Sequence, residues 1–237
     1  MTDGNLGTYG NNNPYNAPTS VTVGGKEYSF AGYNMTLMSK CGVAAKYNDA
    51  LYVRSRFNSA NRNDWSASQM RTWMNGSSVV EGQEWYAPGN FFTTGTITGL
   101  LSRLPDEKFL KAVSPCVNRT WVHDSWKSEK TLDSNGCEHV VDKFWLLGEG
   151  NINAVKSWMY EDAYDTSKFT GIFTSDTESV RIRKFMNEDG SEGDACSWWL
   201  RSAYWTDSIY VGSVHYDGDV FDSSANGIDA CSPVCLI

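Results

Sequence analysis

The amino-acid sequence predicts an α+β domain, with short helices around a mainly antiparallel sheet and with irregular insertions. Strand-forming runs recur along the chain, helical patterns are few and short, and the segments that separate them are irregular. The chain shows no internal repeat, heptad pattern or run of like charges. Strands separated by irregular segments, with a few short helices, are typical of α+β folds.

The length and composition fit a folded domain of substantial size. The chain has 237 residues, enough for one large domain or two small ones, and 41% of them are apolar, which allows a sizeable core. Residues 1–18 are rich in Asn, Gly and Pro, so we expect a flexible leader before a single domain over residues 19–237. No basic segment followed by an apolar run opens the chain, and no apolar run approaches the roughly 20 residues of a membrane helix. We therefore expect neither a signal peptide nor membrane insertion.

The first elements are predicted from turn and cap signals. Two β-forming runs flank a Gly-Gly pair within residues 20–30, which predicts a hairpin, and residues 33–40 predict a third strand. A short helix is predicted over residues 64–76, capped by Ser66 or Ser68 and followed by Gly76. Its apolar stripe consists of Met70, Trp73 and Met74.

The later elements are less regular. Asp217-Gly218 predicts a two-residue hairpin turn, which would place Val214 opposite Phe221 and His215 opposite Val220. Trp145, Leu147, Trp198 and Leu200 are expected in the core. The predicted elements before the turn are helices over residues 94–104 and 105–113, strands over 120–126 and 139–148, a helix over 150–160, a helix or strand over 175–186, a loop over 188–195 and a strand over 196–202.

The cysteines do not predict a metal site. Six of them, at positions 41, 116, 137, 196, 231 and 235, form no CxxC pair, and the chain has three His, so we expect no zinc site. Three disulfides could form in an oxidising compartment. A domain of this size does not need them, so we expect mostly unbridged, buried thiols.

The sequence also lacks the motifs of common enzymes. The GxSxG, HExxH, Walker and GxGxxG patterns are absent, and no Ser, Cys and Asp pattern with catalytic spacing surrounds His215. Asp217, Asp219 and Asp222 do not match a calcium-binding EF-hand loop. The net charge of −8 argues against nucleic acid as a partner. We therefore expect a protein that is not an enzyme and that needs no metal or cofactor.

Three motifs carry a resemblance. "DWSASQMRTWMNG", "VVDKFWLLG" and "WWLRSA" occur in this order. Together they resemble a family of bacterial and phage domains with the C-type lectin fold. The closing "ANGIDACSPVCLI" resembles the family's ending, with Ala230, Cys231, Ser232 and Pro233 in place of a Gly-Val-Arg-Pro-like element. The resemblance covers residues 20–237, although residues 77–138 have no clear match.

The resemblance implies both a fold and a mechanism of variation. Some members of the family are variable proteins of diversity-generating retroelements. In these systems a reverse transcriptase copies a template repeat and randomises its adenines, and the product replaces the end of the target gene. Asn codons that end in a pyrimidine then become other codons that end in a pyrimidine, which cannot encode Lys, Glu, Gln, Met or Trp.

The composition of the C-terminal tail tests this idea independently. The chain contains eleven Lys, eleven Glu, two Gln, seven Met and ten Trp, 41 residues in all. At that frequency the 35 residues from 203 to 237 would hold about six, but they hold one, Trp205. Ordinary β-propensity is the alternative explanation, because strands also disfavour Lys, Glu and Gln.

We therefore predict that residues 203–229 form a variable ligand-binding surface. Tyr, Ser, Gly and Asn, with an occasional Trp, are typical of antibody paratopes, where aromatic rings provide contact area and small polar groups provide adaptable hydrogen bonds. The predicted ligand-binding residues are Tyr204, Trp205, Asp207, Tyr210, His215, Tyr216, Asp219, Phe221, Asp222, Ser224, Asn226 and Asp229.

The resemblance and the tail together predict a receptor or adhesin. Its ligand would be a protein or glycan on a target cell surface, and its place a phage tail or a bacterial cell surface. The EPN, QPD and WND motifs of calcium-dependent lectins are absent. Two alternatives remain open. One is an enzyme of the formylglycine-generating type, for which Cys231 and Cys235 are the one close cysteine pair; the other is a structural phage or cell-wall module without diversification.

Overall fold

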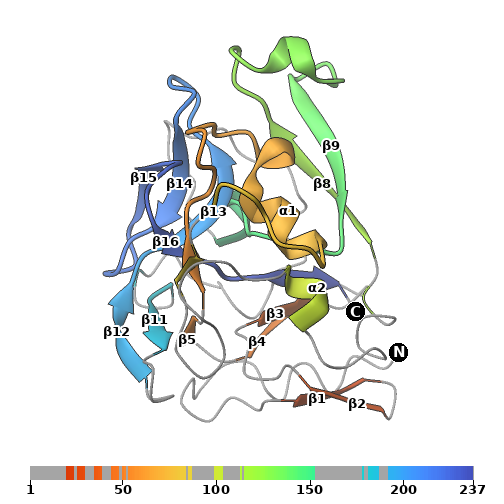
Figure 1. Ribbon diagram of the computed structural model, residues 1–237, viewed down its shortest axis with the longest axis vertical. Coiled ribbons are helices and arrows are strands. Elements are labelled where there is room, and N and C mark those ends of the chain that lie inside the picture. The colour runs from red at the N-terminus through yellow and green to blue at the C-terminus, as the bar shows by residue number, and fades with distance from the viewer. Residues whose placement is uncertain are drawn as a thin grey trace.

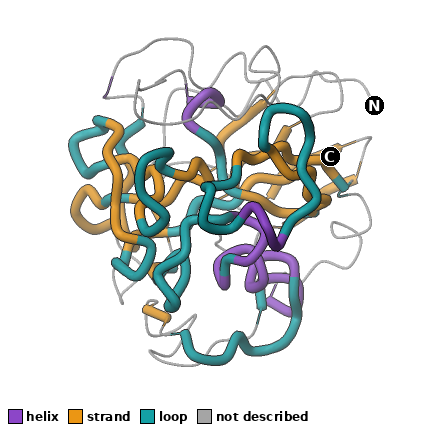
Figure 2. The backbone as a smooth tube through the Cα atoms, turned by 90° about the horizontal axis from the view of Figure 1, so that it is seen from above, coloured by secondary structure: helices purple, strands orange, loops and turns teal. Residues whose placement is uncertain are grey.

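The computed structural model describes residues 53–83, 85–86, 99–103, 113, 115–152, 178, 181–186 and 192–236, and the backbones of short strands within residues 20–51. The described part is a mixed α+β fold with several small sheets and a few short helices (Figure 1). Most of its regular structure is β-strand, so the expected α+β class is confirmed. Loops make up much of the backbone between the short strands (Figure 2).

The largest sheet has six strands in the order β15-β14-β13-β16-β6-β7. β13 (Trp198–Ala203) is antiparallel to β14 (Tyr210–Val214), which is antiparallel to β15 (Val220–Ser224). The predicted variable tail therefore supplies the two strands at one end of this sheet. The strands on the other side of β13 are β16 (Asp229–Ala230), β6 (Arg54–Ser55) and β7 (Trp85–Tyr86).

The remaining strands form smaller sheets. The hairpin predicted around Gly24-Gly25 and the strand that follows it are confirmed. The four-stranded sheet contains β10 (Phe144–Trp145), β17 (Val234–Leu236), β3 (Met35–Met38) and β4 (Ala44–Tyr47) in that order. The three-stranded sheet contains β12 (Glu192–Cys196), β11 (Arg183–Met186) and β5 (Ala50–Leu51). The two hairpins are β1 (Ser20–Val23) with β2 (Lys26–Ser29), and β8 (Cys116–Trp121) with β9 (Cys137–Asp142).

Helix α1 (Gln69–Asn75) follows its predicted signals. The hydroxyl of Ser68 accepts a hydrogen bond from the backbone N–H of Arg71 at 3.0 Å, and Gly76 lies directly after the last turn. Its predicted apolar stripe of Met70, Trp73 and Met74 is fully buried. The other described helices are α2 (Leu100–Arg103) and the 3₁₀ turns η3 (Trp65–Ala67), η4 (Lys127–Glu129) and η5 (Glu149–Ile152).

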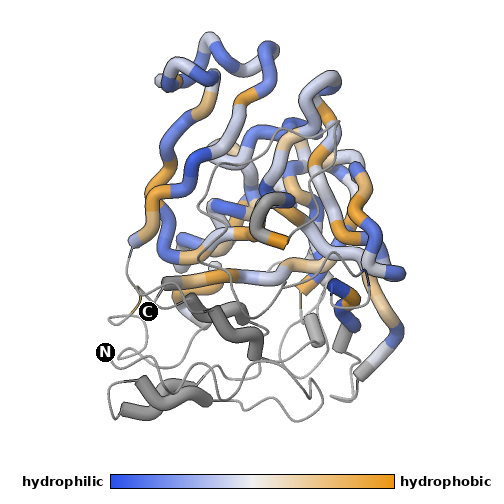
Figure 3. The backbone as a smooth tube through the Cα atoms, turned by 180° about the vertical axis from the view of Figure 1, so that it is seen from behind, coloured by the Kyte–Doolittle hydropathy of each residue, from blue (hydrophilic) through white to orange (hydrophobic). Residues whose placement is uncertain are grey.

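Tryptophans form the centre of the core. Trp145, Leu147, Trp198 and Leu200 are all at most 1% exposed, which confirms the four predicted core positions. The buried indole N–H of Trp198 donates to the backbone oxygen of Arg181 at 3.0 Å, so burial of this ring leaves its polar atom satisfied. The hydrophilic residues collect at loop ends instead, most clearly at the tip of the β8–β9 hairpin (Figure 3).

Three sequence predictions need correction or completion. The predicted loop over residues 188–195 contains most of β12, because its acidic and Gly-rich residues pair with β11 despite their low β-propensity. The predicted strand over residues 120–126 ends at Trp121, where the chain turns into a polar loop. Residues 175–186, which fitted either helix or strand, end in strand β11. The predicted leader, residues 105–112 and residues 153–160 lie outside the described residues, as does Cys41.

Candidate binding surface

The tail presents large apolar side chains to solvent. Among the described residues, six large apolar side chains are exposed, and two of them are Val117 and Val141 on the β8–β9 hairpin. The other four lie in the tail: Trp205, Tyr216, Phe221 and Ile228. The same segment buries Val211, Val214 and Val220. The tail therefore contributes to the core through its valines and to the surface through its aromatic residues.

The turn between β14 and β15 contains three residues, 216–218, rather than the predicted two. The backbone N–H of His215 donates to the carbonyl oxygen of Asp219 at 2.7 Å, and the N–H of Gly218 donates to the carbonyl oxygen of His215 at 2.9 Å. Gly218 has a φ of 93°, a left-handed conformation that glycine adopts without a steric penalty. A short turn followed by a left-handed glycine is a common three-residue hairpin loop.

The extra turn residue changes which side chains face one another. Val214 lies opposite Val220, and Ser213 lies opposite Phe221. The predicted pairs of Val214 with Phe221 and of His215 with Val220 are therefore wrong by one position. A shift of one residue exchanges the two faces of a strand, which explains why the valines are buried together while Phe221 is exposed.

One buried side chain fixes the loop between β13 and β14. Asn63 is fully buried, and its amide nitrogen lies within hydrogen-bond distance of three backbone oxygens, at 3.1 Å from Tyr204, 2.9 Å from Asp207 and 3.1 Å from Tyr210. The backbone N–H of Asn63 donates to the carbonyl oxygen of Ser208 at 3.0 Å. The path of this loop is thus set from outside the tail.

Other scaffold groups hold the tail in the same manner. Each of them donates to a backbone carbonyl oxygen, so the bond does not depend on the side chain that the tail residue carries. The backbone between these points can keep its course while exposed side chains change. The bonds are those from Asn58 N–H to Ala225 (2.8 Å), from Arg56 Nε to Asn226 (3.1 Å) and from Arg181 Nε to Gly218 (2.8 Å).

Two groups of aromatic rings are found among the predicted ligand-binding residues. Tyr204 and Tyr210 meet edge to face, with ring centroids 6.2 Å apart, at the end of β14 next to the β13–β14 loop. At the other end, the ring of His215 lies 4.2 Å from that of Tyr216 and 5.9 Å from that of Phe221. The length of β14 separates the groups by about 13 Å.

Several predicted polar residues are occupied with local hydrogen bonds. Asp207 accepts from the N–H of Ile209 at 3.2 Å, and Asp219 accepts from the N–H of Val220 at 2.8 Å. These two carboxylates therefore shape turns as well as carrying charge. The hydroxyl of Ser224 lies 2.9 Å from the side-chain oxygens of both Asn61 and Asn226, while Asp222 is partly exposed on β15.

Asp229 differs from the other predicted binding residues because its carboxyl group is mostly buried. Burial raises the pKa of Asp229, against the opposing effects of hydrogen bonds with Ser223 and Ser213 and of the nearby charge of His215. Its Oδ2 atom is buried without a hydrogen-bond partner among the described residues. This carboxyl group therefore lies against the side chains of Ser213 and Ser223 rather than on the exposed surface.

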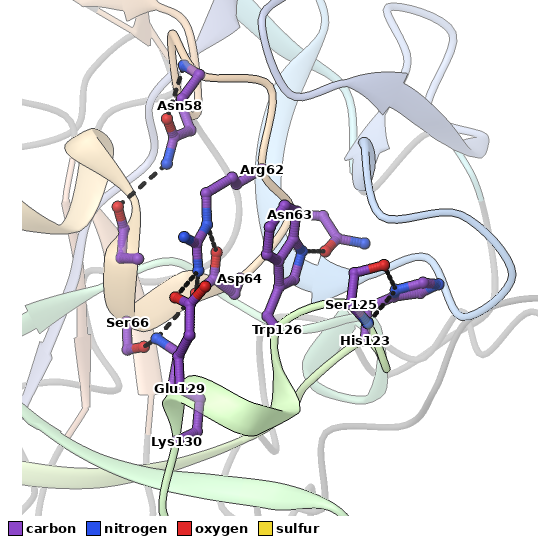
Figure 4. Close-up of polar contacts among 12 residues, drawn as sticks. Asn58, Arg62, Asn63, Asp64, Ser66, His123, Ser125, Trp126, Glu129 and Lys130 are labelled. Carbon is purple, nitrogen blue, oxygen red and sulfur yellow. Dashed lines mark hydrogen bonds and ion pairs between the residues drawn. The ribbon is translucent and has the colours of Figure 1, made fainter.

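A group of residues that sequence reasoning missed lies beside the β13–β14 loop (Figure 4). The guanidinium carbon of Arg62 lies 4.1 Å from the ring centroid of Trp126, and the indole N–H of Trp126 donates to Asn63 Oδ1 at 3.2 Å. Arg62 also pairs with Glu129 at 2.9 Å. No local pattern could have revealed this group, because it joins two segments, residues 62–64 and 126–130, that are far apart in the sequence.

A buried carboxylate holds this group together. Asp64 is fully buried and pairs with Arg62 at 2.9 Å and with Lys130 at 2.8 Å (Figure 4). Burial opposes ionisation of Asp64, but the hydrogen bonds from Arg62 and Lys130 outweigh it, so the pKa of this carboxyl lies below its usual value. Lys130 also bonds to Ser66. The ion pairs tie the loop before α1 to the β8–β9 hairpin.

The described cysteines do not form a reactive pair. All five are present as thiols, and four of them are buried. Burial raises the pKa of both Cys231 and Cys235, so neither is poised as a thiolate. Among the described residues, no three His, Cys, Asp or Glu side chains are grouped as metal ligands. Among the described residues, no helix combines the length and the apolar character that are needed to span a membrane.

Comparison with known proteins identifies a family without a known activity. Residues 34–237 match the model of a domain of unknown function, DUF6273. The chain belongs to the DUF6273 family. No curated protein and no solved structure matches it.

The DUF6273 region includes both the scaffold and the tail. Asn63, Arg181 and residues 203–229 all lie within the matched range of 34–237. The residues that hold the tail and the tail itself therefore belong to the same domain.

Proposed function

We propose that this DUF6273 protein is a receptor or adhesin that displays residues 203–229 as a diversified ligand-binding surface on a scaffold of the C-type lectin fold. Its ligand is a protein or glycan on a target cell surface. It acts on a phage tail or on a bacterial cell surface, and its tail is the variable target of a diversity-generating retroelement.

The observation that carries this proposal is the way in which the tail is held. Asn63, Arg56 and Arg181 donate their side-chain hydrogen bonds to backbone oxygens of the tail. Four large apolar side chains of the tail are meanwhile exposed to solvent. A segment that is fixed through its backbone can change its exposed side chains at little cost in stability, since substitutions at surface sites usually have small effects.

The arrangement of the three sequence motifs supports the proposed scaffold. They lie on α1, on β9 with β10, and on β13. The backbone N–H of Arg201 in the third motif donates to the carbonyl oxygen of Leu147 in the second at 2.9 Å. Each motif also contributes a fully buried tryptophan: Trp73, Trp145 and Trp198. The motifs that carry the resemblance thus build one core beneath the tail.

The proposal can be tested on DNA. We expect a near-identical repeat of the sequence that encodes the tail, differing at adenines, beside a reverse transcriptase gene. In copies of the gene from independent isolates, substitutions should concentrate at codons for exposed residues such as Tyr216, Phe221 and Asn226, while Val211 and Gly218 stay constant. A locus with no repeat, and with substitutions spread evenly along the gene, would contradict the proposal.

A further inference from the structure

The turn between β14 and β15 carries an exposed group of three rings, His215, Tyr216 and Phe221, which we call the turn patch. Tyr216 is 53% exposed and Phe221 is 51% exposed. The ring of His215 lies between them, with centroid distances of 4.2 Å and 5.9 Å. Exposed neighbouring aromatic rings are frequent at sites that bind a partner.

Negative charge accompanies these rings. Asp217 is exposed within the turn, and its Oδ1 lies 3.6 Å from His215 Nδ1. Residues 203–237 contain five Asp and no Lys, Arg or Glu, so they account for five of the eight units of net negative charge. Arg181 bonds to the turn through Gly218 but is only 2% exposed, so it presents little positive charge to a partner.

This combination of rings and carboxylates fits a cationic group. Lys and Arg side chains bind over the faces of Tyr and Phe rings, and their hydrogen bonds to carboxylates are stronger than those between neutral groups. A neutral sugar could donate hydrogen bonds to these carboxylates but has no opposite charge to pair with them, and an anionic partner would be repelled by them. The charge of the tail therefore favours a basic protein segment among the ligands that the fold could bind.

We propose, on the basis of the function proposed above, that the partner of this tail is a protein that places an Arg- or Lys-bearing segment on the turn patch. The cation lies over the rings of Tyr216 and Phe221, and Asp217 accepts its hydrogen bonds. The partly exposed carboxylates of Asp219 and Asp222 attract the segment over longer distances, which makes the association sensitive to salt.

The probe for this proposal is a blocked hexapeptide of alternating Arg and Gly, titrated at low salt into the isotope-labelled full chain and followed by NMR. We expect shifts of the signals from residues 215–221. Phe221→Leu keeps an apolar side chain but removes the ring, and should weaken binding about two- to five-fold. Asp217→Asn should weaken binding and reduce its dependence on salt. Val141→Ala, which removes exposed apolar surface from strand β9 outside the tail, is the matched control and should leave the affinity unchanged.

Three outcomes would overturn the inference. They are shifts that leave out residues 215–221, equal affinity of Phe221→Leu and the unsubstituted protein, and a neutral hexasaccharide that moves the same signals while the peptide does not. The DNA test above is independent of this one. A template repeat without peptide binding would refute the basic partner alone, whereas peptide binding without a repeat would refute diversification and leave the turn patch as a binding site.

Discussion

The side-chain amide of Asn63 donates to the backbone oxygen of Asp207 at 2.9 Å. This bond joins a fully buried scaffold residue to a loop 144 positions later in the chain. The oxygen of the same amide group, Oδ1, accepts a hydrogen bond from the indole N–H of Trp126 at 3.2 Å. Asn63 thus connects the loop before α1, the β8–β9 hairpin and the tail through one amide group.

Replacement of Asn63 should show how much the tail depends on it. Asn63→Ala would leave buried carbonyl oxygens and the indole N–H of Trp126 without their partner, and should lower the free energy of unfolding by about 2–3 kcal/mol. Chemical denaturation measures this change. Asn226→Ala, an exposed asparagine within the tail, is the control and should stay within about 0.5 kcal/mol of the unsubstituted protein. Equal losses for both variants would show that the loop is not held by Asn63.

The tryptophans should separate core from surface. Trp145→Ala and Trp198→Ala remove fully buried rings, and each should cost about 3–5 kcal/mol in a thermal or chemical melt. Trp205→Ala removes a ring that is 50% exposed in the tail and should cost far less. If the three variants melted at the same temperature, the division of this chain into scaffold and display surface would be wrong.

Gly218 should not tolerate a side chain, although it lies in the predicted variable segment. Its φ is 93°, and a Cβ built there would lie 2.0 Å from the backbone oxygen of Glu178. We expect Gly218→Ala to destabilise the fold by about 1–3 kcal/mol, as is usual for strained backbone conformations. Gly227→Ala is the comparison, because its Cβ would lie 3.0 Å from its nearest atom and its φ is not positive. A melt of Gly218→Ala at the unsubstituted temperature would disprove the three-residue turn.

Asp229 should affect the pH dependence of stability. Burial raises its pKa in the folded protein, so ionisation is penalised there relative to the unfolded chain, whose carboxyl has a pKa of about 3.9. The free energy of unfolding should therefore fall as pH rises from this value through the folded pKa, and then level off. Asp229→Asn lacks that decrease. We expect the unsubstituted protein to lose stability relative to the variant across this window, as measured by denaturation at several pH values. A relative gain with rising pH would show that the folded pKa is lowered instead.

Cap residues, apolar spacing and turn residues predicted those elements of the fold that are determined by neighbouring residues in the sequence. The cap at Ser68, the apolar spacing of Met70, Trp73 and Met74, and the Gly after the helix together located α1. Trp145 and Trp198 were predicted to lie in the core because they belong to apolar, strand-forming runs, and both are buried. These predictions held because each rested on interactions between residues that are close in the sequence or on the burial of large apolar side chains.

The features that the sequence did not predict depend on long-range contacts or on single positions. Nothing in the sequence distinguishes Asn63 from other asparagines in loops. Its role depends on long-range hydrogen bonds with Trp126 and with the β13–β14 loop. Asp217-Gly218 indicated a turn but not its length, and one additional residue was enough to reverse the faces of β15. Asp229 was placed on the surface because nothing near it in the sequence indicates its burial or its hydrogen bonds with Ser213 on β14 and Ser223 on β15.

The central claim is that the exposed side chains of the tail can vary while its backbone keeps one conformation. Two displayed libraries of the full chain test it, each randomised at five positions and sorted for resistance to protease. The surface library changes Trp205, Tyr216, Phe221, Asn226 and Ile228. The buried library changes Val211, Val214, Val220, Ala225 and Ala230.

The comparison of the two libraries decides the matter. We predict that most members of the surface library resist protease as well as the unsubstituted protein does, and that few members of the buried library do. If the surface library lost resistance as often as the buried library, the tail would be an ordinary part of the sheet, and its composition would reflect β-propensity alone.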